Sequence, residues 1–410
     1  MHARSLRRRD CGSAPAGYDR LNPIRVLHVI PGLSPKDGGP TNALHGMARA
    51  SAALGAQVTV ATSDDDAGGR LDVPLARPLT VGDVDYWYFA RSLPGSWKPS
   101  IGLARWLSAN VARFDVVHVH ALFSFSTIPA SRFAHRAGVP VVLRPLGTIA
   151  PWSMAHRGWK KRPYFALVER AHLESAAAIH TTSESEREAV AALGYGSKVR
   201  VIPLGVEILE RHDRPVRDDW ASLRLLFLGR LHPVKAVPVL LEALAAARRR
   251  GVAAVLTIAG DGTPAYRAEL ERLVASLGLD GAVNFVGHVD AERKRALFMA
   301  ADAYVLPSYQ ENFGIAAAEA LAAGLPVIVS DRVGIAPQIA EARAGLVVPV
   351  DEEALSAAIE LLASDPRRLE SMGDEAHRLA TAQFSWDRTA TSLLELYEEL
   401  RHHARGRRRR

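Results

Sequence analysis

Residues 24–62 read IRVLHVIPGLSPKDGGPTNALHGMARASAALGAQVTVAT, and this stretch decides the fold class. Ile24–Ile30 is a short apolar and largely β-branched run, which is typical of a strand buried on both faces. A glycine-rich loop follows at 31–40, then helical spacing of apolar residues over 41–54, then a second strand at 58–62. The order of strand, glycine loop, helix and strand predicts a βαβ unit and hence a parallel sheet.

The same alternation continues along the chain and restarts once. In the first half it predicts strands at 116–120, 139–144, 178–182 and 199–202, with helices at 170–177 and 184–193. Charges and a proline at 213–219 predict a linker. Beyond it we predict strands at 223–228, 254–259, 283–286, 303–307, 327–330 and 345–348, and helices at 236–249, 264–277, 290–299, 355–363 and 386–401. The sequence therefore predicts an α/β protein with two doubly wound, Rossmann-like domains facing each other across a cleft that holds the ligand.

Length and composition fit this class. The chain has 410 residues, 48% hydrophobic and 23% charged, which excludes a mainly disordered or fibrous protein. Its one cysteine, Cys11, excludes an intrachain disulfide and fits a reducing compartment. Residues 1–22 lack an apolar run, so we expect a disordered basic leader rather than a signal peptide. No run of eighteen apolar residues occurs, so we expect no membrane-spanning helix.

The basic excess lies in the first half of the chain. Residues 1–210 hold 25 Lys and Arg against 17 Asp and Glu, whereas residues 211–410 hold 26 against 27. A basic half can face nucleic acid, an anionic membrane or phosphorylated substrates. Charge alone leaves a nucleic-acid-binding protein open as an alternative, although helix-turn-helix, zinc-finger and RNP-type patterns do not occur in the sequence.

The segment Tyr304–Asp331 is the richest in candidate site residues. A strand and a polar loop precede Gly314, which opens an alanine-rich helix. A helix N-terminus presents free N–H groups and a positive dipole end, which suits phosphate. Glu311 precedes the helix and Glu319 lies within it on another face. We therefore predict different tasks for the two, with Glu319 accepting both hydroxyls of a ribose.

A second candidate segment is Leu225–Lys235, LLFLGRLHPVK. An apolar strand ends at Gly229, where the backbone can approach a ligand closely. Arg230 and Lys235 follow within one short loop, and two cations at the carboxyl end of a parallel strand predict a diphosphate clamp.

Several motifs in a fixed order carry a family resemblance. They are Gly229–Lys235 (GRLHPVK), Ala259–Gly262 (AGDG), Phe285–Gly287 (FVG), the pair Glu311 and Glu319, and Ala323–Ser330 (AGLPVIVS). Together they resemble the donor domain of the retaining family-four (group 1) glycosyltransferases, which have the GT-B fold. The stretches Arg144–Trp152 and Trp159–Arg162 resemble the subgroup that builds exopolysaccharides and O-antigens.

The resemblance implies the domain boundaries and a shared site. It implies an acceptor-side domain over 23–212, a nucleotide-sugar donor domain over 213–384 and a helix over 385–404 that crosses back to the first domain. The catalytic residues would be Arg230, Lys235, Glu311 and His120. Donor-binding residues would be Gly38, Gly39, Gly229, Gly260, Asp261, Val286, Phe313, Gly314, Ile315 and Glu319. His120 would face the transferred sugar, and we assign His118 to the other side of its strand.

Metals are not expected. The resemblance implies a metal-independent enzyme without a cofactor other than the nucleotide-diphosphate sugar as co-substrate. The triple acid Asp64–Asp66 has no partner cluster in the sequence, and we interpret it as a solvated loop. The chain also departs from the family at Gln338, where an acid is common, so no sugar contact is assigned there.

The predicted function is retaining transfer of a hexose to a hydroxyl of a glycan or a lipid-linked acceptor in cell-surface polysaccharide assembly. A nucleotide-sugar 2-epimerase of the same architecture stays open as an alternative. Trp159, Lys160 and Lys161 are predicted on the acceptor or membrane side, because aromatic and basic residues together suit a lipid interface. The resemblance to the subgroup adds Arg144 to this side. The alternative for this stretch is a partly buried helix with a basic face. We expect a cytoplasmic protein that acts on a polyprenyl-diphosphate-linked sugar, with peripheral contact to the inner face of the cell membrane.

Overall fold

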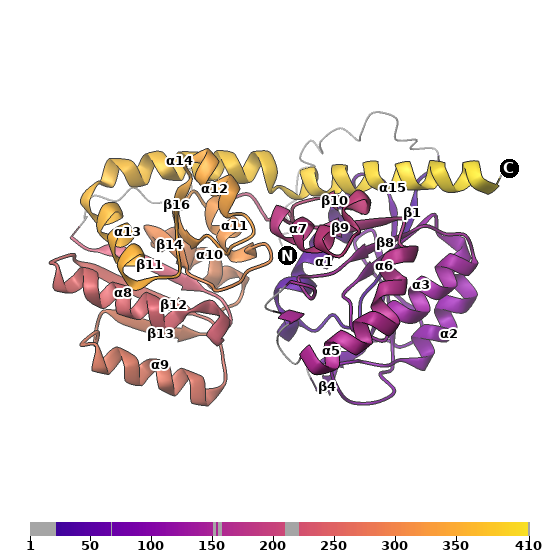
Figure 1. The fold of residues 1–410 in the computed structure, drawn as a ribbon, viewed down its shortest axis with the longest axis horizontal. Helices are drawn as coiled ribbons and strands as arrows, with labels where there is room; N and C mark the ends of the chain where they lie inside the picture. The colour runs from indigo at the N-terminus through magenta and orange to yellow at the C-terminus, as the bar shows by residue number, and fades with distance from the viewer. Residues whose placement is uncertain (1–21, 67, 151–152, 155–157, 210–220, 409–410) are drawn as a thin grey trace, which may run out of the picture. The chain divides into compact units, whose positions relative to one another are not determined.

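The computed structural model describes residues 22–66, 68–150, 153–154, 158–209 and 221–408. These residues form two compact units: unit 1 runs to Gly205 and is completed by the chain from Trp386 onward, and unit 2 is Val206–Ser385 (Figure 1). The change of unit precedes the boundary predicted at residues 212 and 213. The predicted leader with Cys11 and the predicted linker at 213–219 lie outside the described residues.

Unit 1 contains an eight-stranded sheet in the order β10-β9-β8-β7-β1-β2-β6-β5. Its strands are β1 (Arg25–Val29), β2 (Gln57–Ser63), β5 (Pro78–Val81), β6 (Val84–Phe89), β7 (Val116–His120), β8 (Val141–Arg144), β9 (Ala178–Thr181) and β10 (Val199–Val201). All pairs are parallel except β5 with β6 at one edge. The strand order reverses between β1 and β7, which makes the carboxyl ends of these two strands the expected ligand edge.

Helices follow most of these strands. They are α1 (Gly39–Ala53), α2 (Ile101–Asn110), α3 (Thr127–Arg136), α5 (Gly158–Tyr164), α6 (Arg170–Ser175) and α7 (Glu184–Ala192). A π-helical turn, η3 (Phe165–Glu169), joins α5 to α6, and a small hairpin pairs β3 (Asp65–Asp66) with β4 (Gly69–Arg70). The helices bury apolar faces against the sheet, where Leu27, Val117 and Leu143 are fully buried.

Helix α15 (Trp386–Arg408) belongs to unit 1 and packs on α1 (Figure 1). Its first residue, Trp386, is wedged between two glycines. A Cβ at Gly46 would lie 2.0 Å from the indole ring, and one at Gly205 would lie 2.5 Å from it. Because no real Cβ contact is that short, only glycine at these positions lets the helix dock.

Unit 2 contains a six-stranded parallel sheet in the order β13-β12-β11-β14-β15-β16. Its strands are β11 (Leu223–Leu228), β12 (Ala254–Ala259), β13 (Val283–Gly287), β14 (Ala303–Leu306), β15 (Val327–Ser330) and β16 (Gly345–Val348). Its helices are α8 (Val237–Arg249), α9 (Pro264–Ser276), α10 (Ala291–Ala300), α11 (Ile315–Ala322), α12 (Ala336–Ala342), α13 (Glu352–Ser364) and α14 (Pro366–Gln383). The order reverses between β11 and β14, so the two units repeat one Rossmann-like plan.

Candidate active site

The carboxyl ends of β11 and β14 bring two predicted catalytic residues of unit 2 together. Lys235 lies in a 3₁₀ turn (Pro233–Lys235) after β11, and Glu311 lies in the loop after β14. The Lys235 Nζ and a Glu311 carboxylate oxygen form an ion pair, although the residues are 76 positions apart in sequence. Their side chains are 17% and 22% exposed, so the pair is accessible from one side. A partly buried ion pair therefore lies where β11 and β14 end, at the point where the strand order of the sheet reverses.

Arg230 lies on the same loop as Lys235 but is more exposed and takes no part in the ion pair. Its side chain is exposed, and within the described residues it has no side-chain partner. A guanidinium in this condition can form a bidentate pair with a phosphate without first breaking an ion pair. The predicted clamp thus consists of one available cation and one cation that Glu311 holds.

Glycines bring the loops after β11, β12 and β13 close together. Gly260 has a φ of 130°, and a Cβ there would lie 2.0 Å from the Gly229 carbonyl oxygen. The Leu231 N–H donates to the Asp261 carbonyl at 2.8 Å, which joins the two loops side by side. Val286 is half-buried near the end of β13. The predicted donor-binding residues of these loops therefore lie along one edge of the sheet.

Helix α11 begins at this same edge. Gly314, its N-cap, has a φ of 98°, and a Cβ there would lie 2.8 Å from a Val333 side-chain carbon. The first-turn amides, starting with Ile315, point out of the helix end and favour an anion. The Phe313 side chain is 3% exposed and packs edge-on against Phe384. Phe313 can therefore serve a ligand only through its backbone.

Glu319 points from α11 toward α10. One carboxylate oxygen accepts from the Lys294 ammonium at 2.6 Å, a partner that sequence reasoning missed. Tyr304 of β14 is buried, and its hydroxyl donates to the Leu228 carbonyl at 3.0 Å. Burial raises the pKa of Tyr304 well above its usual value, and the charges of Glu311 and Glu319 add to that shift. The charges of both carboxylates act on Tyr304, but Glu311 pairs with Lys235 and Glu319 with Lys294, and their different tasks stay a prediction.

Gly38 and Gly39 lie in unit 1, where the loop after β1 meets α1: Gly38 precedes the helix and Gly39 is its first residue. Gly38 is the N-cap of α1 and has a φ of 64°, which a glycine adopts without strain. The loop before it is tied to the hairpin, because Asp66 accepts from the Ser34 hydroxyl and the Lys36 ammonium, each at 2.6 Å. The glycine loop is therefore held at the carboxyl end of β1.

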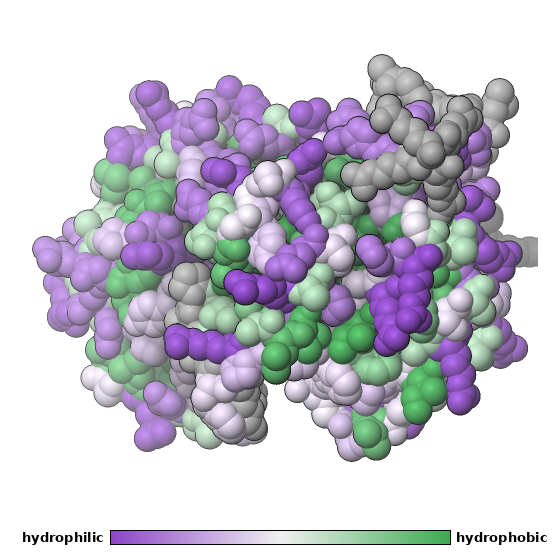
Figure 2. Space-filling view, turned by 45° about the vertical axis from the view of Figure 1, so that its right-hand side comes forward, coloured by the Kyte–Doolittle hydropathy of each residue, from purple (hydrophilic) through white to green (hydrophobic). Residues whose placement is uncertain are grey.

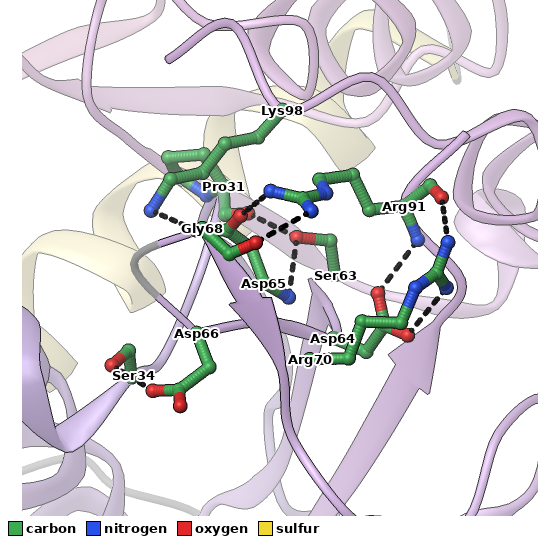
Figure 3. A network of polar contacts seen from close by, with 10 residues as sticks. All are labelled: Pro31, Ser34, Ser63, Asp64, Asp65, Asp66, Gly68, Arg70, Arg91 and Lys98. Carbon is green, nitrogen blue, oxygen red and sulfur yellow. Dashed lines mark hydrogen bonds and ion pairs between the residues drawn. The ribbon is translucent and has the colours of Figure 1, made fainter. Parts of the chain in front are cut away.

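The interpretation of Asp64–Asp66 as a solvated loop is wrong for two of the three acids. Asp64 and Asp65 are 2% and 1% exposed, and Figure 3 shows them facing three basic side chains. Asp64 accepts from Arg70 at 2.9 Å and from the Arg91 amide at 2.7 Å. Asp65 pairs with the Arg91 guanidinium and, at 2.9 Å, with the Lys98 ammonium. Burial without such partners would be very costly, so these contacts make the acids part of the scaffold.

Strand β7 places His120 and His118 on the same face, so the assignment of His118 to the other side is wrong. Residues two apart share a face of a strand, and the two rings stack with centroids 4.2 Å apart. His28 of β1 is paired in register with His118, and its Nδ1 lies 2.9 Å from the His120 Nε2. All three rings are fully buried. A contact of His120 with the transferred sugar stays a prediction.

A chain of hydrogen bonds extends from α15 through these histidines. The Tyr397 hydroxyl lies 2.7 Å from His118 Nδ1, His118 Nε2 lies 3.4 Å from His180 Nδ1, and His180 Nε2 lies 2.9 Å from the Ile202 carbonyl oxygen. Because the carbonyl can only accept, His180 Nε2 carries a proton, and the remaining roles follow one by one back to Tyr397. The chain needs neutral rings. Burial lowers the pKa of His28 and His180 to about 3, and Arg144 adds to the effect.

Arg144 is buried close to these rings, so the membrane alternative of its predicted acceptor or membrane side is wrong, and the acceptor alternative stays a prediction. It is 3% exposed on the interior strand β8, in register with His120, so it cannot reach a lipid surface. Burial lowers the pKa of Arg144 to about 10. Ligand atoms of His28, His118 and His120 lie within 4.8 Å of one another, the only such cluster within the described residues. The positive charge of Arg144 opposes a metal cation there.

The other residues predicted on the acceptor or membrane side lie in helix α5. Trp159 is 76% exposed, and Lys160 lies in the same helix. The Lys161 ammonium donates to the Ser153 carbonyl at 2.6 Å and lies over the Phe123 ring. Over the described residues, no helix is both long and apolar enough to cross a membrane.

Two features define the class of this protein. The first is the pair of Rossmann-like units. The second is the sheet edge of unit 2, which carries a cluster of glycine-containing loops, a Lys–Glu ion pair and a helix N-terminus. Family models agree, one described as glycosyl transferase 4-like domain over residues 38–205 and one as glycosyl transferases group 1 over residues 217–379. The chain belongs to the group 1 glycosyltransferases, and its fold is GT-B.

Known relatives have several different names. The chain is 31% identical over 295 residues to a glycogen synthase of Mycobacterium tuberculosis, which covers 70% of this chain and 69% of the relative. It is 31% identical over 386 residues to D-inositol 3-phosphate glycosyltransferase 2 of Catenulispora acidiphila, which covers 81% and 90%. Solved structures of similar fold include sucrose-phosphate synthase from Thermosynechococcus elongatus, with TM-score 0.74, 24% identity and coverage of 92% and 99%. Anabaena HepE in complex with UDP and glucose has TM-score 0.71, 19% identity and coverage of 92% and 99%.

Proposed function

We propose that this protein is a retaining hexosyltransferase that moves a sugar from a nucleotide-diphosphate sugar to a hydroxyl of a glycan or lipid-linked acceptor, in cell-surface polysaccharide assembly. The observation that carries the proposal is the juxtaposition of Arg230, the Lys235–Glu311 pair and the α11 N-terminus at one sheet edge. Cations and free amides together are suited to a diphosphate leaving group. The UDP bound in Anabaena HepE supports a nucleotide-sugar donor.

Each residue of the edge has a role in this proposal. Arg230 and Lys235 neutralise the charge that develops on the leaving diphosphate, and the α11 amides add to that stabilisation. Lys235 exchanges part of its contact with Glu311 for the phosphate, which frees Glu311 to orient the transferred sugar. Glu319 accepts the ribose hydroxyls. The bond from the anomeric carbon to the phosphate oxygen breaks as the acceptor oxygen bonds to that carbon on the same face, and the acceptor proton passes to the departing phosphate.

The protein is further proposed to work at the inner face of the cell membrane. The outward side of α5 and η3 carries Trp159 and Leu167, which are 76% and 82% exposed, and the exposed Arg162 and Arg170 lie beside them. Figure 2 shows hydrophobic and hydrophilic surface side by side on one face of the molecule. An apolar face bordered by arginines fits the boundary between acyl chains and anionic headgroups.

The proposal is tested by incubating the protein with nucleotide sugars, UDP-glucose first, with and without candidate hydroxyl acceptors. We expect transfer with the anomeric configuration of the donor kept, as proton NMR of the product shows. Inverted product would exclude the retaining mechanism. Conversion of the donor into another free nucleotide sugar, with no transfer to any acceptor, would identify an epimerase instead.

A further inference from the structure

A buried glutamate on the inward side of the π-helical turn η3 has no part in the proposed chemistry. Glu169, the last residue of η3, is 0% exposed, whereas Leu167 of the same turn is 82% exposed. Its Oε1 accepts from the Phe123 backbone N–H at 2.5 Å. A π-helical turn inserts a residue into a helix and redirects its side chains, and such turns occur often at functional sites. Here the turn directs a carboxylate inward and an apolar residue outward.

The amide that Glu169 holds belongs to a strained loop. Residues 121–126 follow His120 directly, and Ala121 and Phe123 have φ values of 75° and 59°. Residues with a Cβ adopt this left-handed conformation only when their surroundings impose it. The Ala121 N–H donates to the Arg144 carbonyl at 3.0 Å, which fixes the start of the loop. The Glu169 contact fixes its middle.

Aromatic packing holds the same loop against the same helical segment. The Phe123 ring lies 5.8 Å from Tyr164 of α5 and 6.5 Å from Phe165 of η3, centroid to centroid. The Trp97 indole N–H donates to the Tyr164 hydroxyl at 3.2 Å, and the Trp97 carbonyl accepts from the Phe125 amide at 3.0 Å. These contacts hold the Phe123 ring and the amide of residue 125, whereas the hydrogen bond to Glu169 holds the amide of residue 123 itself.

Burial of a charged carboxylate at this contact has a high free-energy cost. The second oxygen, Oε2, is buried and has no hydrogen-bond partner within the described residues. Burial accordingly raises the pKa of Glu169 to about 7. A neutral amide could accept the same hydrogen bond at a lower desolvation cost, so Glu169→Gln can be used to test the contact.

We propose that Glu169 is a positioning residue for the loop that follows β7: it holds the Phe123 amide and thereby fixes the 121–126 backbone at the end of the strand that carries His120. The consequence for catalysis rests on the proposed function together with the predicted contact of His120 with the transferred sugar. The consequence for the loop does not. Two separate measurements therefore test the two parts.

The first measurement is hydrogen exchange of the ligand-free protein by mass spectrometry. In Glu169→Ala we expect the peptide over residues 121–127 to exchange at least tenfold faster than in the wild-type protein. In Glu169→Gln, which keeps an acceptor oxygen, we expect exchange close to wild type. Glu174→Ala removes an exposed carboxylate from α6 of the same segment and serves as the matched control. Equal exchange of this peptide in Glu169→Ala and wild type would overturn the proposal, and so would loss of protection in Glu169→Gln.

The second measurement is UDP release from UDP-glucose in the presence of the hydroxyl acceptors of the transfer assay, with thermal unfolding as the check on folding. Unit 2 holds the proposed nucleotide site, so Glu169→Ala should leave KM unchanged and lower kcat about tenfold, while Glu169→Gln keeps kcat. A raised KM at unchanged kcat would overturn the link to His120. If the wild-type protein releases no UDP at all, the proposed function fails for this donor, and hydrogen exchange still decides the claim about the loop.

Discussion

The two units repeat one plan and differ in what they place at the point where their strand order reverses. Unit 2 has charged side chains there that stay partly exposed: Arg230, and the Lys235–Glu311 pair. Unit 1 has His28, His118 and His120 there, all 0% exposed and close to Arg144. The exposed set can exchange its partners for those of a ligand. In the buried set, His28 contacts His120 and His118 contacts Tyr397, so these hydrogen bonds are made within the fold.

This difference separates two kinds of polar residue. Removal of an exposed cation should change binding and rate with little effect on folding, because water replaces the lost contact. Removal of a buried polar group should change stability, because its partner is left unsatisfied in the interior. Variants in the two units can therefore test this difference.

The largest effect is expected from the cations of unit 2. Arg230→Ala and Lys235→Ala should each lower kcat for transfer by about 10²–10³, the usual result of removing one stabilising donor from a developing anion. Initial rates at saturating donor measure the effect. Arg368→Ala, an exposed arginine on α14, is the matched control and should leave the rate unchanged. Near-normal rates in both variants would remove the clamp from the account.

The next effect is the response of unit 1 to acid. Its four buried histidines have folded-state pKa values far below 6.5, chiefly because burial disfavours the charged ring. They contribute stability that is present above pH 6.5 and is lost as pH falls toward 3. Glu169 acts the opposite way, because burial raises its pKa and its contribution is lost as pH rises through about 7.

Urea unfolding followed by circular dichroism between pH 7.5 and 4 measures this dependence. The midpoint should fall steadily below pH 6.5, and His180→Gln should make the fall shallower. His402→Gln, at a 73% exposed side chain, should leave the pH dependence of the wild-type protein unchanged. A midpoint that is constant down to pH 4 would contradict the neutral, buried histidines.

A smaller effect is expected at Glu319. Glu319→Ala should weaken binding of the nucleotide sugar about tenfold while kcat changes little, because the ribose contact is present in both the ground state and the transition state. Isothermal titration calorimetry measures the affinity. Lys294→Ala removes the ion-pair partner of Glu319 but keeps the carboxylate, so it should weaken binding of the nucleotide sugar less. An unchanged affinity in Glu319→Ala would remove the ribose role.

The removal of one hydroxyl from the buried chain comes next. Tyr397→Phe leaves His118 Nδ1 without its donor and should lower the free energy of unfolding by about 1–3 kcal/mol. Urea unfolding at pH 7.5 measures the loss. Donor affinity, a property of unit 2, should stay the same. A large loss of donor affinity with no loss of stability would contradict a structural role for the buried set of unit 1.

The smallest effect concerns the outward face of α5 and η3. The double change Trp159→Ala with Leu167→Ala should reduce flotation with phosphatidylglycerol-containing vesicles several-fold and leave the unfolding midpoint nearly unchanged, because both side chains are exposed. Vesicles of pure phosphatidylcholine are the control for charge. Equal flotation of the variant and the wild-type protein would show that another surface contacts lipid.

Much of the fold could be predicted because buried parallel strands are short apolar runs bounded by glycine and proline. The strands at 116–120, 223–228 and 327–330 begin and end as predicted. The hairpin of β5 and β6 and the helices α2, α3, α12 and α14 were not predicted, since their apolar residues are fewer or mixed with polar ones.

Individual site residues could be predicted, but their pairing could not. Lys235 and Glu311 lie 76 positions apart, and the sequence contains nothing that links them. Asp65 was misjudged because Arg91 and Lys98, which neutralise it, come from a distant loop. Asp64 pairs with Arg70, which lies only six positions further along the chain. The histidine cluster had a usable signal: His28, His118 and His120 all occur within apolar strands predicted to be buried.

The central claim is that the edge of unit 2 binds a diphosphate through Arg230 and Lys235. Calorimetric titration with UDP and with UMP, on the wild-type protein and on Arg230→Ala, tests it most directly. The account predicts that the wild-type protein binds UDP more tightly than UMP, and that Arg230→Ala loses most of that difference. An Arg230→Ala protein that keeps the full preference for UDP would contradict the claim.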